Sequence, residues 1–137
     1  MKTMADEEQM KEKYERFQML QQQMEQVSQH LEMFNQQLAD LEISINAVKE
    51  LGKAEKDNEV LASIADGIFF KAKLVENKKL IVNVGSDVTV ERTVPEVIEL
   101  LKQQKKDVSE KMQEADEVMQ QISKEAMSIY QEVEELQ

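Results

Sequence analysis

Few residues of this 137-residue chain have a type and spacing suited to catalysis or metal binding. His30 is the only histidine and cysteine is absent, so no second histidine or thiolate can complete a zinc site. Gly85-Ser86 does not belong to a phosphate-binding loop, because the chain has only three glycines. We therefore expect no catalytic residue, no metal and no cofactor, and we expect His30 to be a solvated helix residue.

Clustered glutamates are the other candidates for acid–base chemistry. They occur near both chain ends, as Glu7-Glu8 and as Glu132 with Glu134-Glu135. Neighbouring carboxylates can act as general acids when their surroundings shift their pKa values. Each cluster lies in a helical sequence pattern, however, where such residues usually form a solvated face. We therefore expect that the protein is not an enzyme.

Methionine, aromatic and aliphatic residues near the two ends form the remaining candidate site. Thioethers and aromatic rings at an exposed surface provide the adaptable apolar contact that promiscuous protein binders use. We predict that these side chains meet at a tip and form an adaptable apolar surface for binding other proteins. The tip residues are Met4, Met10, Tyr14, Phe17, Ile129, Tyr130, Val133 and Leu136. The alternative is that the aliphatic and Phe members only complete a helix–helix seam while the terminal methionines fray.

Two long heptad runs would position these residues. Apolar residues recur with alternating spacings of three and four from Phe17 to Val48, and again from Val94 to Leu136 with Lys105 as the only polar member. The first run is Phe17, Leu20, Met24, Val27, Leu31, Phe34, Leu38, Leu41, Ile45 and Val48. The second is Val94, Ile98, Leu101, Lys105, Val108, Met112, Ala115, Met119, Ile122, Ala126, Ile129, Val133 and Leu136. The runs predict an antiparallel two-helix coiled coil.

Local signals set the inner ends of the two helices. Gly52 follows the first run and predicts a glycine-capped helix end there. Thr93 and Glu96 have the spacing of a capping box, and Pro95 lies in the first turn, where its missing N–H has no cost. The helices should run from about residue 7 to 51 and from 94 to 136.

Between the helices the apolar period changes to about two, which is typical of β-strands. Apolar and polar residues alternate clearly in stretches 68–75, 79–84 and 87–91, and more weakly in 60–64. The separators 65–67, 76–78 and 85–86 have turn compositions that can supply positive φ angles. We predict two tandem β-hairpins at the bend. The inward-facing residues, which we expect at a subunit interface, are Phe70, Ala72, Leu74, Leu80, Val82, Val84, Val88 and Val90.

The predicted fold class is therefore α+β. An N-terminal helix spans residues 1–52, a hairpin region that forms an oligomerisation hub spans 53–93, and a C-terminal helix spans 94–137. Two isolated hairpins leave open strand edges and a half-covered apolar face, so the strands should pair with those of other subunits.

The charge distribution limits the possible partners. Residues 1–52 carry five basic and ten acidic side chains, residues 94–137 carry five and eleven, and the segment between them is balanced. Acidic helices repel phosphate backbones and anionic lipid, which argues against nucleic acid and membrane ligands. Without cysteines, a secretory signal or a long apolar run, we expect a cytoplasmic protein.

The layout of helix, two hairpins and helix resembles the alpha class of the prefoldin family. The most distinctive segments are Ile68-Phe69-Phe70-Lys71-Ala72-Lys73, Ile81-Val82-Asn83-Val84-Gly85 and Val90-Glu91-Arg92-Thr93. The resemblance implies a hetero-hexamer of two alpha-class and four beta-class subunits with a β-barrel hub. It also implies an ATP-independent chaperone that captures unfolded client proteins at the helix tips and transfers them to a group II chaperonin.

Two other functions fit the same pattern. Hairpins that pair with copies of this chain would produce a structural scaffold or a filament. A parallel dimeric coiled-coil adaptor fits less well, because the interruption at 52–93 is long and rich in strand sequence.

Overall fold

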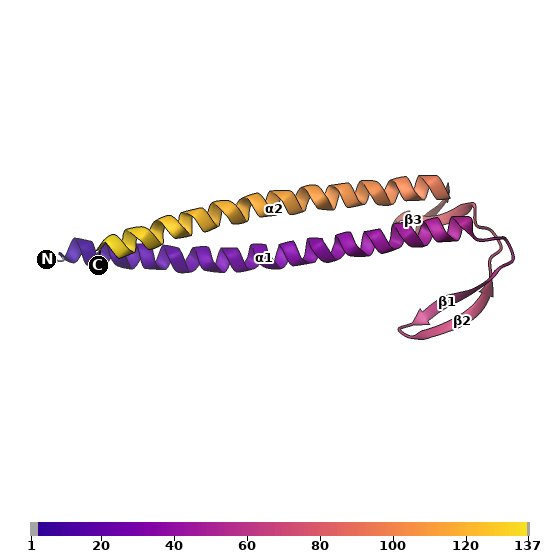
Figure 1. Ribbon diagram of the computed structural model, residues 1–137, viewed down its shortest axis with the longest axis horizontal. Coiled ribbons are helices and arrows are strands. Elements are labelled where there is room, and N and C mark those ends of the chain that lie inside the picture. Colours follow the sequence, from indigo (N-terminus) through magenta and orange to yellow (C-terminus); the bar gives the residue numbers. More distant parts are fainter. Residues whose placement is uncertain (1–2, 137) are drawn as a thin grey trace. The chain divides into compact units, whose positions relative to one another are not determined.

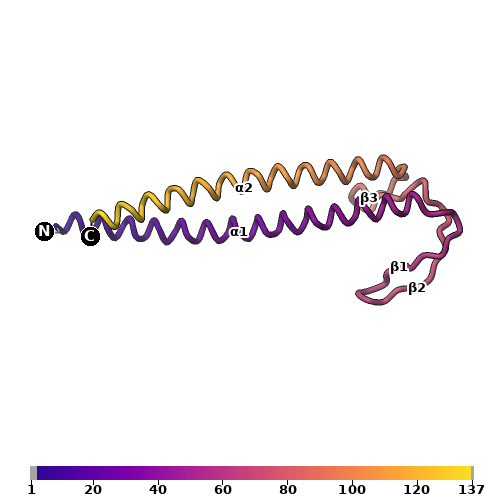
Figure 2. The backbone as a smooth tube through the Cα atoms, viewed as in Figure 1, coloured from indigo at the N-terminus to yellow at the C-terminus, as the bar shows by residue number. Residues whose placement is uncertain are grey.

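The computed structural model describes residues 3–136, and it has two long helices with two β-hairpins between them (Figure 1). Helix α1 spans Met4–Lys53 and helix α2 spans Val94–Leu136; each is unbroken in the backbone trace (Figure 2). The strands are β1 (Glu59–Ala65), β2 (Ile68–Lys73), β3 (Lys79–Gly85) and β4 (Val88–Thr93). The predicted order of elements is confirmed.

The chain divides into two compact units. The described residues within Met1–Leu38 and Asp107–Gln137 form one unit, and Ala39–Lys106 form the other. In the first unit Lys13 pairs with Glu132 and Arg16 with Glu125, so the helix segments run antiparallel. In the second, Glu42 pairs with Lys105, and Gly52 lies against Val94, which shows the same direction.

The predicted seam is confirmed. Every residue of the two heptad runs is buried or partly buried, whereas apolar residues off the seam, such as Met33 and Ile43, are exposed. A repeat of seven keeps one stripe of each helix against its partner. The buried residues are few, since a two-helix seam is narrow: Leu20, Ile45 and Ala126 belong to the predicted seam, and Val97, which the heptad runs did not include, is buried as well.

Both helices begin with reciprocal side-chain caps. The Glu96 backbone N–H donates to Thr93 Oγ1 at 3.3 Å, and the Thr93 backbone N–H donates to Glu96 Oε1 at 3.3 Å, as the capping box predicts. The hydrogen bond from the Thr93 hydroxyl, with that from its backbone N–H, lowers the pKa of the Glu96 carboxyl. Thr3 and Asp6 form a similar pair, which explains why α1 begins at Met4 rather than near residue 7.

The predicted glycine cap at the end of α1 is wrong. The helix continues through Gly52 to Lys53, and the only left-handed residue that follows before β1 is Asp57, with φ of 70°. A Cβ built on Gly52 would lie 3.0 Å from Val94 Cγ1, so the glycine permits a close approach between the two helices. The Asn77 side-chain amide instead donates to the carbonyls of Gly52 and Ala54, which supplies the missing cap.

The hairpins form two separate two-stranded antiparallel sheets. Val60 opposes Ala72 in one sheet and Val82 opposes Val90 in the other, and each sheet has one register shift beside its turn. Positive φ angles occur at Gly67 in the first turn and at Gly85, Ser86 and Asp87 in the second. Residues 76–78, which connect the two hairpins, have no positive φ angle, and the Asn77 side chain caps the end of α1.

The residues expected at a subunit interface differ in their exposure within the single chain. Leu74 lies just beyond β2, although its backbone N–H still donates to the Asn58 carbonyl at 2.9 Å. Ala72, Leu74, Leu80, Val82 and Val90 are partly buried, while Phe70, Val84 and Val88 are exposed. The opposite faces also expose large apolar residues that the sequence pattern did not single out, namely Leu61, Phe69 and Ile81.

Replacing Lys105 tests whether apolar contact at the seam stabilises the helix pair more than an ion pair does. Lys105 Nζ lies 2.6 Å from Glu42 Oε2, and this hydrogen bond is the main cause of the lowered pKa of Glu42. We predict that Lys105→Leu raises the free energy of unfolding by about 1 kcal/mol, because it adds apolar contact to the seam in place of an exposed ion pair. Thermal unfolding followed by circular dichroism measures this change. Lys106→Leu, one residue off the seam, should produce no gain, and a lower Tm for Lys105→Leu would contradict the prediction.

Candidate functional site

A groove between the two helices collects several of the predicted tip residues. It has a volume of about 290 Å³ and is lined by Tyr14, Phe17, Ile129, Tyr130, Val133 and Glu134. We call it the tip groove. The Phe17 and Tyr130 rings lie 6.2 Å apart between centroids with an interplanar angle of 41°, a favourable tilted geometry.

A second groove adjoins the tip groove, with Tyr14 and Val133 common to both. Its other lining residues are Glu7, Met10 and Lys11, so Met10 also belongs to this apolar region. Two predicted tip residues line neither groove: Met4 is 83% exposed, and Leu136 is partly buried. The structure thus brings six of the predicted tip residues together.

The heptad positions of the groove residues explain how far each side chain is exposed to solvent. Phe17, Ile129 and Val133 are seam residues and form the partly buried floor. Tyr14 and Tyr130 flank the seam and remain 58% and 52% exposed. The ion pairs Lys13–Glu132, at 3.2 Å, and Arg16–Glu125, at 3.0 Å, join the two helices in the same antiparallel register.

The polar groups of the tip groove are few. The Tyr130 hydroxyl hydrogen-bonds to Glu134, which raises the pKa of the tyrosine. Across the described residues, no three His, Asp or Glu side chains are grouped so that they could hold a metal ion. His30 lies on α1 with its ring 6.4 Å from Phe34. The groove can therefore bury apolar side chains and present one carboxylate beside them.

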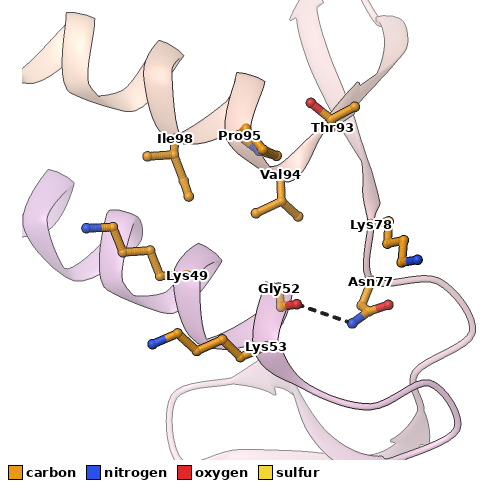
Figure 3. Close-up of a pocket in the computed structure, with 9 residues that line it drawn as sticks. All are labelled: Lys49, Gly52, Lys53, Asn77, Lys78, Thr93, Val94, Pro95 and Ile98. Atoms are coloured by element: carbon orange, nitrogen blue, oxygen red, sulfur yellow. Dashed lines mark hydrogen bonds between the residues drawn. The ribbon is translucent and has the colours of Figure 1, made fainter.

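A larger cavity, of about 620 Å³, lies in the unit that contains the hairpins (Figure 3). Val94, Pro95 and Ile98 of α2 face it from one side, and Lys49, Gly52 and Lys53 of α1 from the other. Asn77 and Lys78 border it beside the end of α1. The sequence reasoning missed this cavity because it depends on the Gly52–Val94 approach, which is a tertiary contact.

The chain matches a known protein family over most of its length. The model of the family described as "Prefoldin subunit" matches residues 20–137. The chain belongs to the prefoldin family. Prefoldin subunits are components of a chaperone, and the predicted resemblance is confirmed.

Curated relatives of this prefoldin chain are archaeal alpha subunits. Prefoldin subunit alpha 1 of Methanocaldococcus jannaschii is 31% identical over 76% of this chain and 80% of its own length. The alpha subunit of Pyrococcus horikoshii is 29% identical over 88% and 82%, and that of Archaeoglobus fulgidus is 28% identical over 95% of both. These matches agree with the two hairpins, on which the predicted alpha-class resemblance was based.

A solved structure supports the fold. The chain superposes on filamentous PFD from Methanocaldococcus jannaschii with a TM-score of 0.78, covering 87% of this chain and 98% of that one, at 16% sequence identity. No described helix has the length and apolar character needed to cross a membrane.

A double-mutant cycle tests the role of Gly52. Alanine is favoured over glycine in a helix by about 0.5–1 kcal/mol, but here its Cβ would press on Val94. We predict that Gly52→Ala stabilises the chain by this amount in a Val94→Ala background and by distinctly less in the wild type. Urea unfolding of the four variants measures the coupling. Equal effects in both backgrounds would show that the close approach is not the reason for the glycine.

Proposed function

We propose that this prefoldin chain is a subunit of a cytoplasmic, ATP-independent chaperone that holds unfolded client proteins in the tip groove. The observation that carries the proposal is the convergence of Tyr14, Phe17, Ile129, Tyr130 and Val133 from both helices on one open apolar surface. Unfolded chains expose apolar side chains without a common shape, and an adaptable aromatic and aliphatic surface suits them. Holding such a chain requires no bond to be made or broken.

We propose that the hairpins assemble the subunit into a larger complex. Each sheet has only two strands and exposes apolar side chains, among them Phe70, Val84 and Val88, which is marginal as an isolated unit. Pairing with strands of beta-class subunits would cover these residues in a β-barrel hub. We propose the composition of two alpha and four beta subunits, with clients passed to a group II chaperonin.

A filament of this chain alone is the second candidate. It is favoured by one observation, namely that the superposed structure is of a filamentous prefoldin. The same exposed hairpin edges would serve either assembly. The native mass of the purified chain distinguishes them, because a discrete species that grows only when a second type of subunit is added favours the chaperone complex. Open homopolymers favour the filament.

Removing the exposed tip aromatics should weaken client holding. We predict that Tyr14→Ser with Tyr130→Ser raises the amount of chain needed to suppress aggregation of a denatured protein by about tenfold. Light scattering during dilution of the client, without nucleotide, measures the effect. Ile43→Ser with Leu100→Ser removes two apolar residues that are likewise exposed on the helices and should leave protection intact. An equal loss of protection in both double variants would contradict the assignment of the client-binding site to the tip groove.

Placing a charge on the inner face of the hairpin should block assembly. Val88 lies on the same face as Val90, whereas Thr89 points to the other face opposite Asn83. We predict that Val88→Lys gives a helical chain that stays monomeric, because burying an unpaired ammonium at a subunit interface is costly. Thr89→Lys, with the same added charge, should assemble normally. Native mass spectrometry reports both results, and assembly of Val88→Lys would overturn the proposed interface.

A further inference from the structure

The tip groove combines an apolar floor with a single kind of charge. Among its lining residues Glu134 is the single carboxylate, and none is lysine, arginine or histidine. The neighbouring groove differs, because it has Lys11 as well as Glu7 along its border. The tip groove is therefore a place where a cation would be attracted and a second carboxylate repelled.

The surroundings strengthen this negative potential. Residues 125–136 include four glutamates and neither lysine nor arginine. Arg16 and Lys13 neutralise Glu125 and Glu132. Glu134 and Glu135 form no ion pair within the part of the chain that the structure describes. Carboxylates beside an apolar surface of low dielectric constant raise the local concentration of cationic groups.

Exposed aromatic rings supply a second means of attracting a cation. Tyr14 and Tyr130 border the groove and are each more than half exposed. A guanidinium or ammonium group above such a ring is stabilised by its quadrupole. Glu134 is held beside the Tyr130 ring by their hydrogen bond, so the carboxylate and the aromatic face are available to the same cation.

We propose that the tip groove selects unfolded segments in which arginine or lysine flanks an aliphatic or aromatic residue. The apolar side chain lies on the floor formed by Phe17, Ile129 and Val133, and the cation lies over the tyrosine rings against Glu134. Segments with acidic flanks are rejected by the same carboxylate. This inference rests on the proposed holding function and defines the chemical class of client that the groove prefers.

Matched peptides test the selection. Three labelled peptides share one apolar sequence and differ only in flanking residues, which are Arg, Ser or Glu. Fluorescence anisotropy with the full-length chain, at low and at high sodium chloride, gives their affinities. We expect the Arg peptide to bind about three- to tenfold more tightly than the Ser peptide, with the Glu peptide weakest, and we expect salt to reduce the difference.

A charge-matched pair of variants locates the effect. Glu134→Gln keeps a hydrogen-bond acceptor for Tyr130 and should lower the preference for Arg over Ser peptides, with little change for the Ser peptide. Glu110→Gln makes the same charge change at an exposed position elsewhere on α2 and should leave the preference unaltered.

Four outcomes would overturn the inference. Equal affinities of the Arg and Ser peptides would refute the selection while leaving apolar client binding intact. An unchanged preference in Glu134→Gln, or an equal loss in Glu110→Gln, would show that the overall charge of the helices is responsible. If no peptide binds and the chain does not suppress aggregation, the proposed holding function fails as well.

Discussion

The heptad seam between α1 and α2 is the constraint on which the rest of the structure depends. Because each helix offers its partner only one stripe, very few side chains are fully buried, and Leu20 is the largest. A seam of this kind stabilises paired helices without creating an enclosed cavity. Every other apolar residue must lie on a surface, where it either contacts another molecule or remains exposed to water. The strongly acidic composition of both helices keeps such a surface soluble.

Two surfaces are left open for this reason, and they differ in composition. The tip groove has aromatic rings, a seam-derived floor and a carboxylate, which suits varied and transient contact. The hairpins present β-branched and aromatic residues on strands with unpaired edges, which suits a permanent and specific contact. In the function we propose, the tip groove is the surface for clients and the hairpins are the surface for other subunits.

Sequence patterns predicted the seam, the hairpins and the α2 cap because each depends on local spacing. Lys105 was recognised as the polar seam residue, but its partner Glu42 depends on the register between the helices. The misinterpretation of Gly52 has the same origin, since its environment is set by Val94, forty-two residues later in the chain. Period-two alternation assigned one face of each hairpin and gave no reason to expect Leu61, Phe69 and Ile81 exposed on the other. Glu134 was noted only as part of a solvated cluster, although its spacing of four residues from Tyr130 places the two side chains side by side on the predicted helix.

Site-specific photo-cross-linking tests the central claim, that clients bind at the tip groove, most directly. A photoreactive phenylalanine analogue replaces Tyr130 in one variant and Ile43, which is 67% exposed, in another. Each variant is illuminated with a denatured client. We expect cross-links to the client from position 130 and none above background from position 43. Equal cross-linking at both positions, or cross-linking only at 43, would contradict this claim.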